Sequence, residues 1–100
     1  MTQLNSQQRR YLRSLAHHLE PSVYVGKQGI TDPVVQSVAE ALAAHELIKV
    51  RFVDRKDEKK ELTEELASRS DSAIAGIIGN IAILYRQNED PDKRRIEFED

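Results

Sequence analysis

The stretch VYVGKQGITDP, at residues 23–33, restricts the possible folds of this chain more than any other feature. The β-branched and aromatic run at 22–25 predicts a strand. Thr31 or Asp32 can cap a following helix, which has Pro33 near its first turn. Strand and helix are joined by a G-x-x-G loop that consists of Gly26, Lys27, Gln28 and Gly29. Any fold of this chain must therefore pass from a strand to a helix within a few residues.

The hydrophobic pattern of the whole chain predicts a one-domain α/β fold. In order, it indicates a helix over 5–19, a strand over 22–25, a helix over 31–45, a strand over 47–53, a helix through 62–70, and strands over 73–78 and 81–85. The order α-β-α-β-α-β-β predicts a single compact domain, in which a small four-stranded mixed sheet is packed with helices. We place this domain at 1–86, followed by a polar acidic tail at 87–100 that either frays or forms a short edge strand.

The first predicted helix has a clear start signal and a basic side. Asn5 or Ser6 can cap it, and Gln8 is placed for a capping box with Asn5. The apolar stripe of this helix consists of Leu12, Leu15, Ala16 and Leu19. Three arginines fall away from that stripe and are expected to face solvent, where they could contact a partner: Arg9, Arg10 and Arg13.

Two of the predicted β segments carry more detailed expectations. Alternation over 47–53 places Lys49 and Arg51 on the face opposite to Ile48, Val50 and Phe52. Lys49 and Arg51 can therefore join a binding surface if their face of the sheet is uncovered. The dipeptide Gly79-Asn80 between the last two strands predicts a type II′ hairpin turn.

Composition favours a folded domain and excludes several kinds of chemistry. Hydrophobic residues make up 39% and charged residues 32% of the 100 positions, which is typical of globular proteins. The absence of cysteine excludes disulfides, thiolate metal sites and a cysteine nucleophile. No apolar run approaches the roughly 18 residues of a membrane helix, and the N-terminal sequence lacks the pattern of a secretion signal, so we expect a cytoplasmic protein.

Charge is distributed unevenly along the chain, although the net charge is only −2. Over residues 1–31 the basic residues are Arg9, Arg10, Arg13 and Lys27, against the single acid Glu20. The acids gather later: Glu61, Glu64, Glu65, Glu89, Asp90, Asp92, Glu97, Glu99 and Asp100. This distribution is compatible with a cationic front and an acidic back.

The G-x-x-G loop has two interpretations. Its glycines can admit a ligand's backbone while the helix start and Lys27 attract a phosphate, as in the loop with which K-homology domains hold a nucleic-acid backbone. Alternatively, Gly26 and Gly29 only permit a tight turn, with Lys27 and Gln28 pointing to water. The nearby basic helix and the lack of an acid between Pro21 and Asp32 favour the first interpretation.

No other pattern indicates a site. His17 and His18 are adjacent and cannot form a metal pair on one helix face, and no positioned base accompanies the serines and threonines, so we expect no metal, no cofactor and no catalysis. The glutamates of the third helix are expected to be a solvated face. Core or edge positions, rather than base-stacking platforms, are expected for Tyr24, Phe52, Tyr85 and Phe98.

Four segments of the chain resemble the CRM domain, the family named for chloroplast RNA splicing and ribosome maturation, and in particular its small bacterial YhbY-like members. The segments are LNSQQRRYLRSLAHHLEP, VYVGKQGITDPVV, ALAAHELIKVRF and IIGNIAILYR, and the likeness runs from about Leu4 to Arg86. Two features depart from the family pattern: Asn80 stands where a basic residue is common, and the tail is acidic.

The resemblance implies an α/β fold similar to the C-terminal domain of translation initiation factor three, without enzymatic activity. It also implies RNA binding, in bacterial members linked to assembly of the large ribosomal subunit, with the loop at 26–29 as the RNA contact. Our hypothesis is therefore binding of ribosomal RNA in a large-subunit precursor through this loop, supported by the arginines of the first helix. The alternative is a protein-interaction module that docks on a basic ribosomal protein or assembly factor through its acidic helix and tail.

Overall fold

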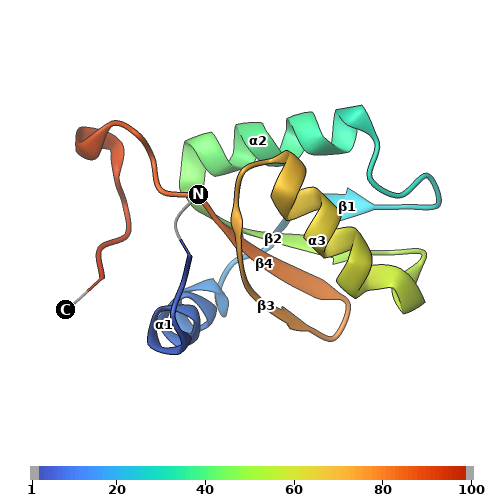
Figure 1. Ribbon diagram of the computed structural model, residues 1–100, viewed down its shortest axis with the longest axis horizontal. Coiled ribbons are helices and arrows are strands. Elements are labelled where there is room, and N and C mark those ends of the chain that lie inside the picture. Colours follow the sequence, from blue (N-terminus) through green and yellow to red (C-terminus); the bar gives the residue numbers. More distant parts are fainter. Residues whose placement is uncertain (1–2, 99–100) are drawn as a thin grey trace.

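The computed structural model describes residues 3–98 and shows a sheet with helices on both faces (Figure 1). The elements are α1 (Ser6–Ala16), β1 (Pro21–Val25), α2 (Asp32–His45), β2 (Leu47–Phe52), α3 (Lys59–Arg69), β3 (Ala73–Ile78) and β4 (Ile81–Tyr85). Two short 3₁₀ turns, η1 (Lys56–Glu58) and η2 (Pro91–Lys93), lie in the connections. The predicted order α-β-α-β-α-β-β is confirmed over the described residues.

The four strands form one mixed sheet in the order β1-β2-β4-β3. β1 runs parallel to β2, whereas β2 and β3 both pair with β4 in antiparallel fashion. Gly79 has a φ of 58° and Asn80 is not among the residues with positive φ, which agrees with the predicted type II′ turn. Because β1 and β2 are parallel, the loops that follow them lie at the same end of the sheet.

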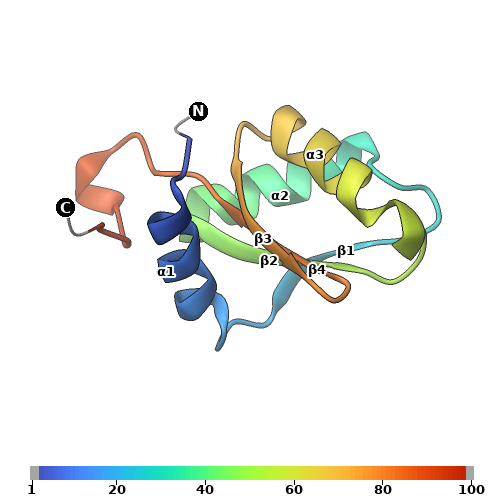
Figure 2. The ribbon, with the colours of Figure 1, turned by 60° about the horizontal axis from the view of Figure 1, so that its bottom comes forward.

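Each face of the sheet has its own core. α2 and α3 cover one face, where a large cluster includes Val25, Val38, Phe52, Leu66 and Leu84. α1 covers part of the other face, where a smaller cluster consists of Leu12, Ala16, Leu47, Ala75, Ile83, Tyr85 and Ile96. Figure 2 shows α1 on the side of the sheet opposite to α2 and α3.

α1 is shorter than the hydrophobic pattern suggests. It ends at Ala16, so Leu19 lies beyond the helix, and only Leu12 and Ala16 of the predicted stripe are buried. Leu15 and Leu19 remain partly exposed, at 37% and 39%. Its start is as predicted: Asn5 accepts a hydrogen bond from the Gln8 amide at 2.7 Å, and the Gln8 side chain accepts one from the Asn5 amide at 3.0 Å.

Removing this capping box is expected to have a modest effect. Asn5→Ala leaves the Gln8 amide without its acceptor, and the free energy of unfolding should fall by about 1 kcal/mol. Chemical denaturation measures this difference, and Gln7→Ala, on the exposed side of the same turn, is the matched control. Equal stabilities of the two variants would contradict a role for the capping box.

The tail docks on the body of the protein rather than fraying. Residues 94–98 have no regular secondary structure, so the predicted edge strand is absent from the described part of the tail. Ile96 is buried in the smaller core, and the Phe98 ring meets the Tyr85 ring edge to face at a centroid distance of 5.6 Å. Burial, and secondarily the charge of Glu46, raises the pKa of the Tyr85 hydroxyl. Glu99 and Asp100 lie outside the described residues.

One buried carboxylate fixes this tail. Glu46, which is 1% exposed, accepts hydrogen bonds from the backbone amides of Asn88 at 2.5 Å, Arg95 at 2.6 Å and Ile96 at 3.1 Å. In Figure 1 the tail lies at the left, at the end of the molecule opposite to the loop that follows β1. The G-x-x-G loop and the acidic tail therefore occupy different ends of the protein.

Candidate nucleic-acid interface

The G-x-x-G loop is a closed turn in which the two glycines differ. The Gly29 amide donates to the Gly26 carbonyl at 3.0 Å, so residues 26–29 form one turn, with Lys27 and Gln28 exposed at its tip. Gly29 is buried and has a φ of +71°, a conformation that favours glycine. Gly26 has no positive φ, and a Cβ placed on it meets nothing within 4 Å. The fold therefore requires glycine at 29 but leaves open space at 26.

The helix that follows the loop begins with a side-chain cap. Thr31 accepts a hydrogen bond from the Val34 amide at 3.3 Å, so the cap is Thr31 and not Asp32. Asp32 pairs instead with Arg69 at the end of α3, and Arg69 also donates to the Ile30 carbonyl at 2.9 Å. The Ile30 contact is partly buried and ties α3 to the segment between loop and helix, which restricts the position of the loop.

Arg55 is a residue of this site that the sequence analysis did not identify. Its backbone adopts a φ of 52°, and its guanidinium lies over Gly29. A Cβ atom added to Gly29 would clash with Nη1 of Arg55. Its Nε donates to the Glu58 carboxylate at 2.6 Å. That hydrogen bond raises the pKa of Arg55 and lowers the pKa of Glu58, so both groups stay charged at neutral pH. The feature that could have revealed Arg55 is the parallel pairing of β1 and β2. This pairing brings the connection at residues 53–55 beside the loop at residues 26–29.

Other cations gather at this end of the sheet. The Lys59 Nζ donates to the Gly79 carbonyl at 2.6 Å, which connects the start of α3 to the β3–β4 turn. The Phe52 amide donates to the Asn80 carbonyl at 2.8 Å, so the same turn adjoins the end of β2. The result is one end of the molecule built from three connections, visible at the right of Figure 1. The basic residues in or next to these connections are Lys27, Arg51, Arg55, Lys56 and Lys59.

The arginines of α1 are not brought to the loop. Arg9 donates to the Leu4 carbonyl at 2.6 Å and to Ser6 at 3.1 Å, within its own end of the helix. Arg13 is not solvent-facing as predicted: it lies against β3, where Nη1 donates to the Ala75 carbonyl at 2.9 Å. Arg10 is exposed, as predicted. These three residues lie across the sheet from α2, whose first turn follows the loop (Figure 2).

Lys49 and Arg51 share the face of the sheet that carries α1, but their surroundings differ. Lys49 is half-buried, with Nζ 3.5 Å from the His17 carbonyl at the end of α1. Arg51 is exposed and lies two residues farther along β2, beyond the part of the face that α1 covers. Arg51 therefore belongs to the loop end of the molecule, and Lys49 to the α1 end.

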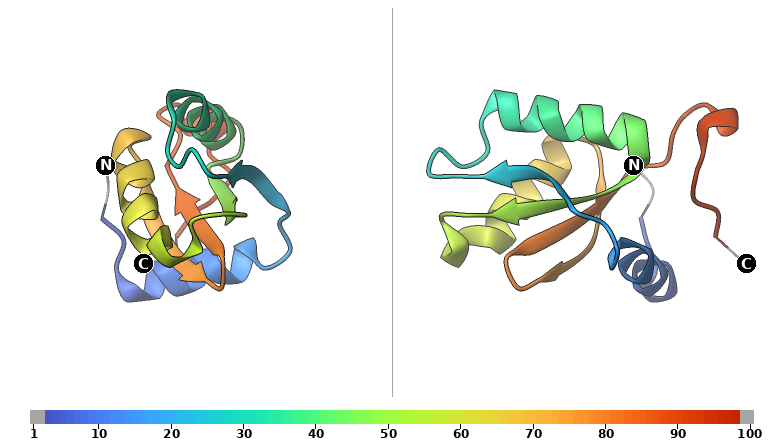
Figure 3. Two further views of the ribbon diagram at one scale, coloured as in Figure 1. Left: turned by 90° about the vertical axis from the view of Figure 1, so that its right-hand side faces the viewer. Right: turned by 180° about the vertical axis from the view of Figure 1, so that it is seen from behind.

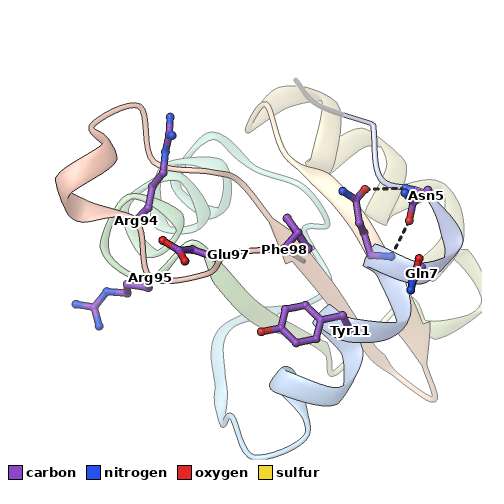
Figure 4. Close-up of a pocket in the computed structure, with 8 residues that line it drawn as sticks. Asn5, Gln7, Tyr11, Arg94, Arg95, Glu97 and Phe98 are labelled. Atoms are coloured by element: carbon purple, nitrogen blue, oxygen red, sulfur yellow. Dashed lines mark hydrogen bonds between the residues drawn. The ribbon is translucent and has the colours of Figure 1, made fainter. Parts of the chain in front are cut away.

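A surface pocket in the described part of the chain lies away from this end. It has a volume of about 780 Å³ and lies between the start of α1 and the tail, lined by Asn5, Gln7, Gln8, Tyr11, Arg94, Arg95, Glu97 and Phe98. Figure 4 shows Asn5 hydrogen-bonded within its own helix turn, and Arg94 and Arg95 extending away from Tyr11. The titratable groups of this pocket do not converge on one point.

Residues 3–98 also contain no group of three side chains arranged to hold a metal ion and no helix able to cross a membrane.

Comparison with known proteins relates the chain to RNA-binding proteins. It is 41% identical over 96 residues to the probable RNA-binding protein YqeI of Bacillus subtilis, covering 95% of this chain and 98% of that protein. It is 38% identical over 91 residues to an RNA-binding protein of Haemophilus influenzae, covering 90% of this chain and 92% of that one.

A solved structure and a family model agree with these relatives. The solution structure of a hypothetical Staphylococcus aureus protein, described as a candidate RNA-binding protein, matches with a TM-score of 0.79 and 35% identity over 94% of this chain and 99% of that one. The family model named CRS1 / YhbY (CRM) domain matches residues 4–86, which include every helix and strand described above. The chain therefore belongs to the CRS1 / YhbY (CRM) domain family.

Proposed function

We propose that the protein binds RNA at the loop end of the molecule, with residues 26–29 as the phosphate contact. The observation that supports this most directly is the open space above Gly26, beside the exposed Lys27, in a turn whose other glycine, Gly29, lies under the guanidinium of Arg55. A phosphate held at this turn would have two cations close by, Lys27 and Arg55. The relatives named above are described as a probable RNA-binding protein and an RNA-binding protein, which agrees with this assignment.

The RNA that we propose as ligand is ribosomal RNA in a precursor of the large subunit. This finer assignment rests on the resemblance to bacterial single-domain members of the family. On this proposal the protein binds without catalysing a reaction. Arg55 replaces the arginines of α1 as the main support of Lys27, because it lies beside the loop, whereas Arg9 and Arg13 bond elsewhere.

The alternative is protein docking through the acidic helix and tail, and the tail part of that surface lies at the opposite end of the molecule. Glu89 and Asp92 are exposed there, on a tail that Glu46 holds in place. Charge reversal at Glu89 and Asp92 is a sharper test than removal of the tail, because removal would also take Ile96 out of the core. The alternative predicts that this reversal abolishes association with ribosomal particles while Lys27→Ala does not.

A salt titration of RNA binding tests the proposed function. Lys27→Ala is expected to weaken binding to ribosomal RNA and to reduce the slope of log affinity against log salt by roughly 0.7–0.9, the value for one lost phosphate contact. Gly26→Ala is expected to weaken binding as well, because its methyl group fills the space that the phosphate needs. The free energy of unfolding of Gly26→Ala should stay unchanged or rise by up to about 1 kcal/mol, since this position has no positive φ.

Lys93→Ala is the matched control, since Lys93 is an exposed lysine at the tail end of the molecule. It should leave affinity and salt slope close to those of the unaltered protein. If Lys27→Ala and Gly26→Ala bind as well as Lys93→Ala, the glycines only permit a turn and the proposed site is wrong.

A further inference from the structure

A row of four side chains crosses the uncovered part of the sheet beside the loop. Tyr24 of β1 is in register with Arg51 of β2, Arg51 with Ile81 of β4, and Ile81 with Ile78 of β3. Residues directly opposite one another in a sheet point to the same face, so these four, one from each strand, form a single row about 14 Å long. We call it the open row.

α1 leaves the open row uncovered. The helix packs on Leu47, Ala75, Ile83 and Tyr85, which lie toward the tail end of the same face. Tyr24 is 57% exposed and Ile78 58% exposed. In the right-hand view of Figure 3, α1 lies under one end of the sheet, whereas the ends of β1 and β2 and the β3–β4 turn extend past it.

The composition of the open row differs from that of an ordinary solvated strand face. It presents an aromatic ring, a guanidinium and two aliphatic side chains, with no acidic residue among them. Tyr24 lies on the edge strand β1, in agreement with the expected core or edge position, and its ring is largely exposed, whereas Phe52 and Tyr85 are buried. An exposed ring on a rigid sheet offers a flat surface on which a base can stack, and a neighbouring arginine can neutralise the adjacent phosphate.

The open row is continuous with the proposed phosphate site. Tyr24 precedes Gly26 by two residues, about 7 Å along an extended strand. Arg51 is followed in the chain by the connection that carries Arg55 over Gly29. A strand of RNA held by a phosphate at Gly26 and Lys27 therefore has a cationic and aromatic surface within reach of its neighbouring nucleotides.

We propose that the open row stacks unpaired bases of the bound RNA, so that the protein prefers a single-stranded or loop segment next to the phosphate held at residues 26–29. This inference rests on the proposed function and adds the class of RNA that the site takes. A base paired within a duplex cannot reach the Tyr24 ring, because it is stacked between its neighbours.

Affinity for two forms of one sequence tests the preference. Tyr24→Ala is expected to weaken binding to a single-stranded RNA oligonucleotide by roughly 5- to 150-fold, the range for loss of one base stacked on an aromatic side chain. Binding to a duplex of the same sequence should change less than twofold. Tyr24→Phe keeps the ring and should bind the single strand nearly as well as the unaltered protein, whereas Leu19→Ala, an exposed apolar position outside the row, should change neither affinity.

Tryptophan fluorescence gives a direct readout of stacking, because the chain contains no tryptophan. Tyr24→Trp places a single indole in the open row, and its emission should be quenched when the single-stranded oligonucleotide is added. Tyr11→Trp places the indole on α1, outside the row, and its emission should not change.

The outcomes separate this inference from the proposed function. If Lys27→Ala weakens binding while Tyr24→Ala does not, the loop binds phosphate and the stacking proposal is wrong. If Tyr24→Ala weakens single-strand and duplex binding equally, or Tyr24→Trp is not quenched by an oligonucleotide that binds, bases do not stack there and the inference is likewise overturned. If neither variant nor the unaltered protein binds RNA, both proposals fail.

Discussion

Replacing Glu46 by alanine is expected to lower the free energy of unfolding by about 3–5 kcal/mol. The carboxylate accepts hydrogen bonds from three backbone amides of the tail. A hydrogen bond to a charged acceptor contributes more to stability than a hydrogen bond between neutral groups. Alanine would leave those amides without an acceptor and release Ile96 from the smaller core. Because small domains unfold with only about 5–15 kcal/mol, this single change should remove a large part of the stability.

Matched variants separate the carboxylate from the backbone conformation at this position. Glu46 has a φ of 65°, so Glu46→Gly relieves backbone strain but loses the acceptor, and it should still be destabilising. Glu46→Gln retains one side-chain oxygen and should fall between alanine and glutamate. Glu40→Ala, at an exposed position of α2, is the control. Chemical denaturation gives the stabilities, and hydrogen exchange at the Ile96 amide reports whether the tail has been released. Equal stability of Glu46→Ala and Glu40→Ala would show that the tail does not depend on this contact.

The elements that the sequence predicted are those whose signals are local. The capping box of α1, the cap and proline at the start of α2, the alternation of β2 and the Gly79-Asn80 turn all lie within a few neighbouring residues. Local propensity and tertiary packing agree at these places, so the pattern alone was sufficient. The family resemblance, which implied an α/β fold, is confirmed by the match over residues 4–86.

The residues that the sequence did not reveal depend on contacts between distant segments. Glu46 looked like a polar residue at a helix end, because its partners lie more than 40 positions later. Arg55 lies in a charged run that resembles a solvated loop, and its place over Gly29 follows only from the pairing of β1 with β2. Arg13 was expected in solvent, but the close approach of its aliphatic stem to Gly76 holds it on the sheet: a Cβ on Gly76 would lie 2.7 Å from Cδ of Arg13.

The exposure of Tyr24 likewise could not be predicted from the sequence, because it depends on which part of the sheet a distant helix covers. Its strand alternates as a half-buried strand should, with Val23 and Val25 in the core. What the sequence could not show is that α1 ends at Ala16 and covers only one part of the opposite face. The uncovered remainder, and with it the open row, is set by the length of one helix and the position at which it crosses the sheet.

Gly29→Ala is expected to lower the free energy of unfolding by about 2–3 kcal/mol, for two separable reasons. A residue with a Cβ is strained at a φ of +71°, which costs about 1–2 kcal/mol. The new methyl group must also displace the Arg55 guanidinium from its place over the loop. RNA binding should weaken as well, because on our proposal Arg55 lies beside the phosphate site. Gly29→Asn should be milder in its backbone cost, since asparagine tolerates this conformation better than alanine.

A double-mutant cycle with Arg55→Ala distinguishes the two reasons. If the guanidinium contributes to the cost, Gly29→Ala should be less destabilising by about 0.5–1 kcal/mol in the Arg55→Ala background than in the unaltered protein. The remaining cost is then the backbone strain. Additive effects would mean that Arg55 moves aside freely and does not help to shape the loop. Gly26→Ala belongs in the same series, because it changes the other glycine of the loop without strain or contact. A loss of RNA affinity at 26 with no loss of stability, beside a loss of both at 29, would assign the first glycine to the ligand and the second to the fold.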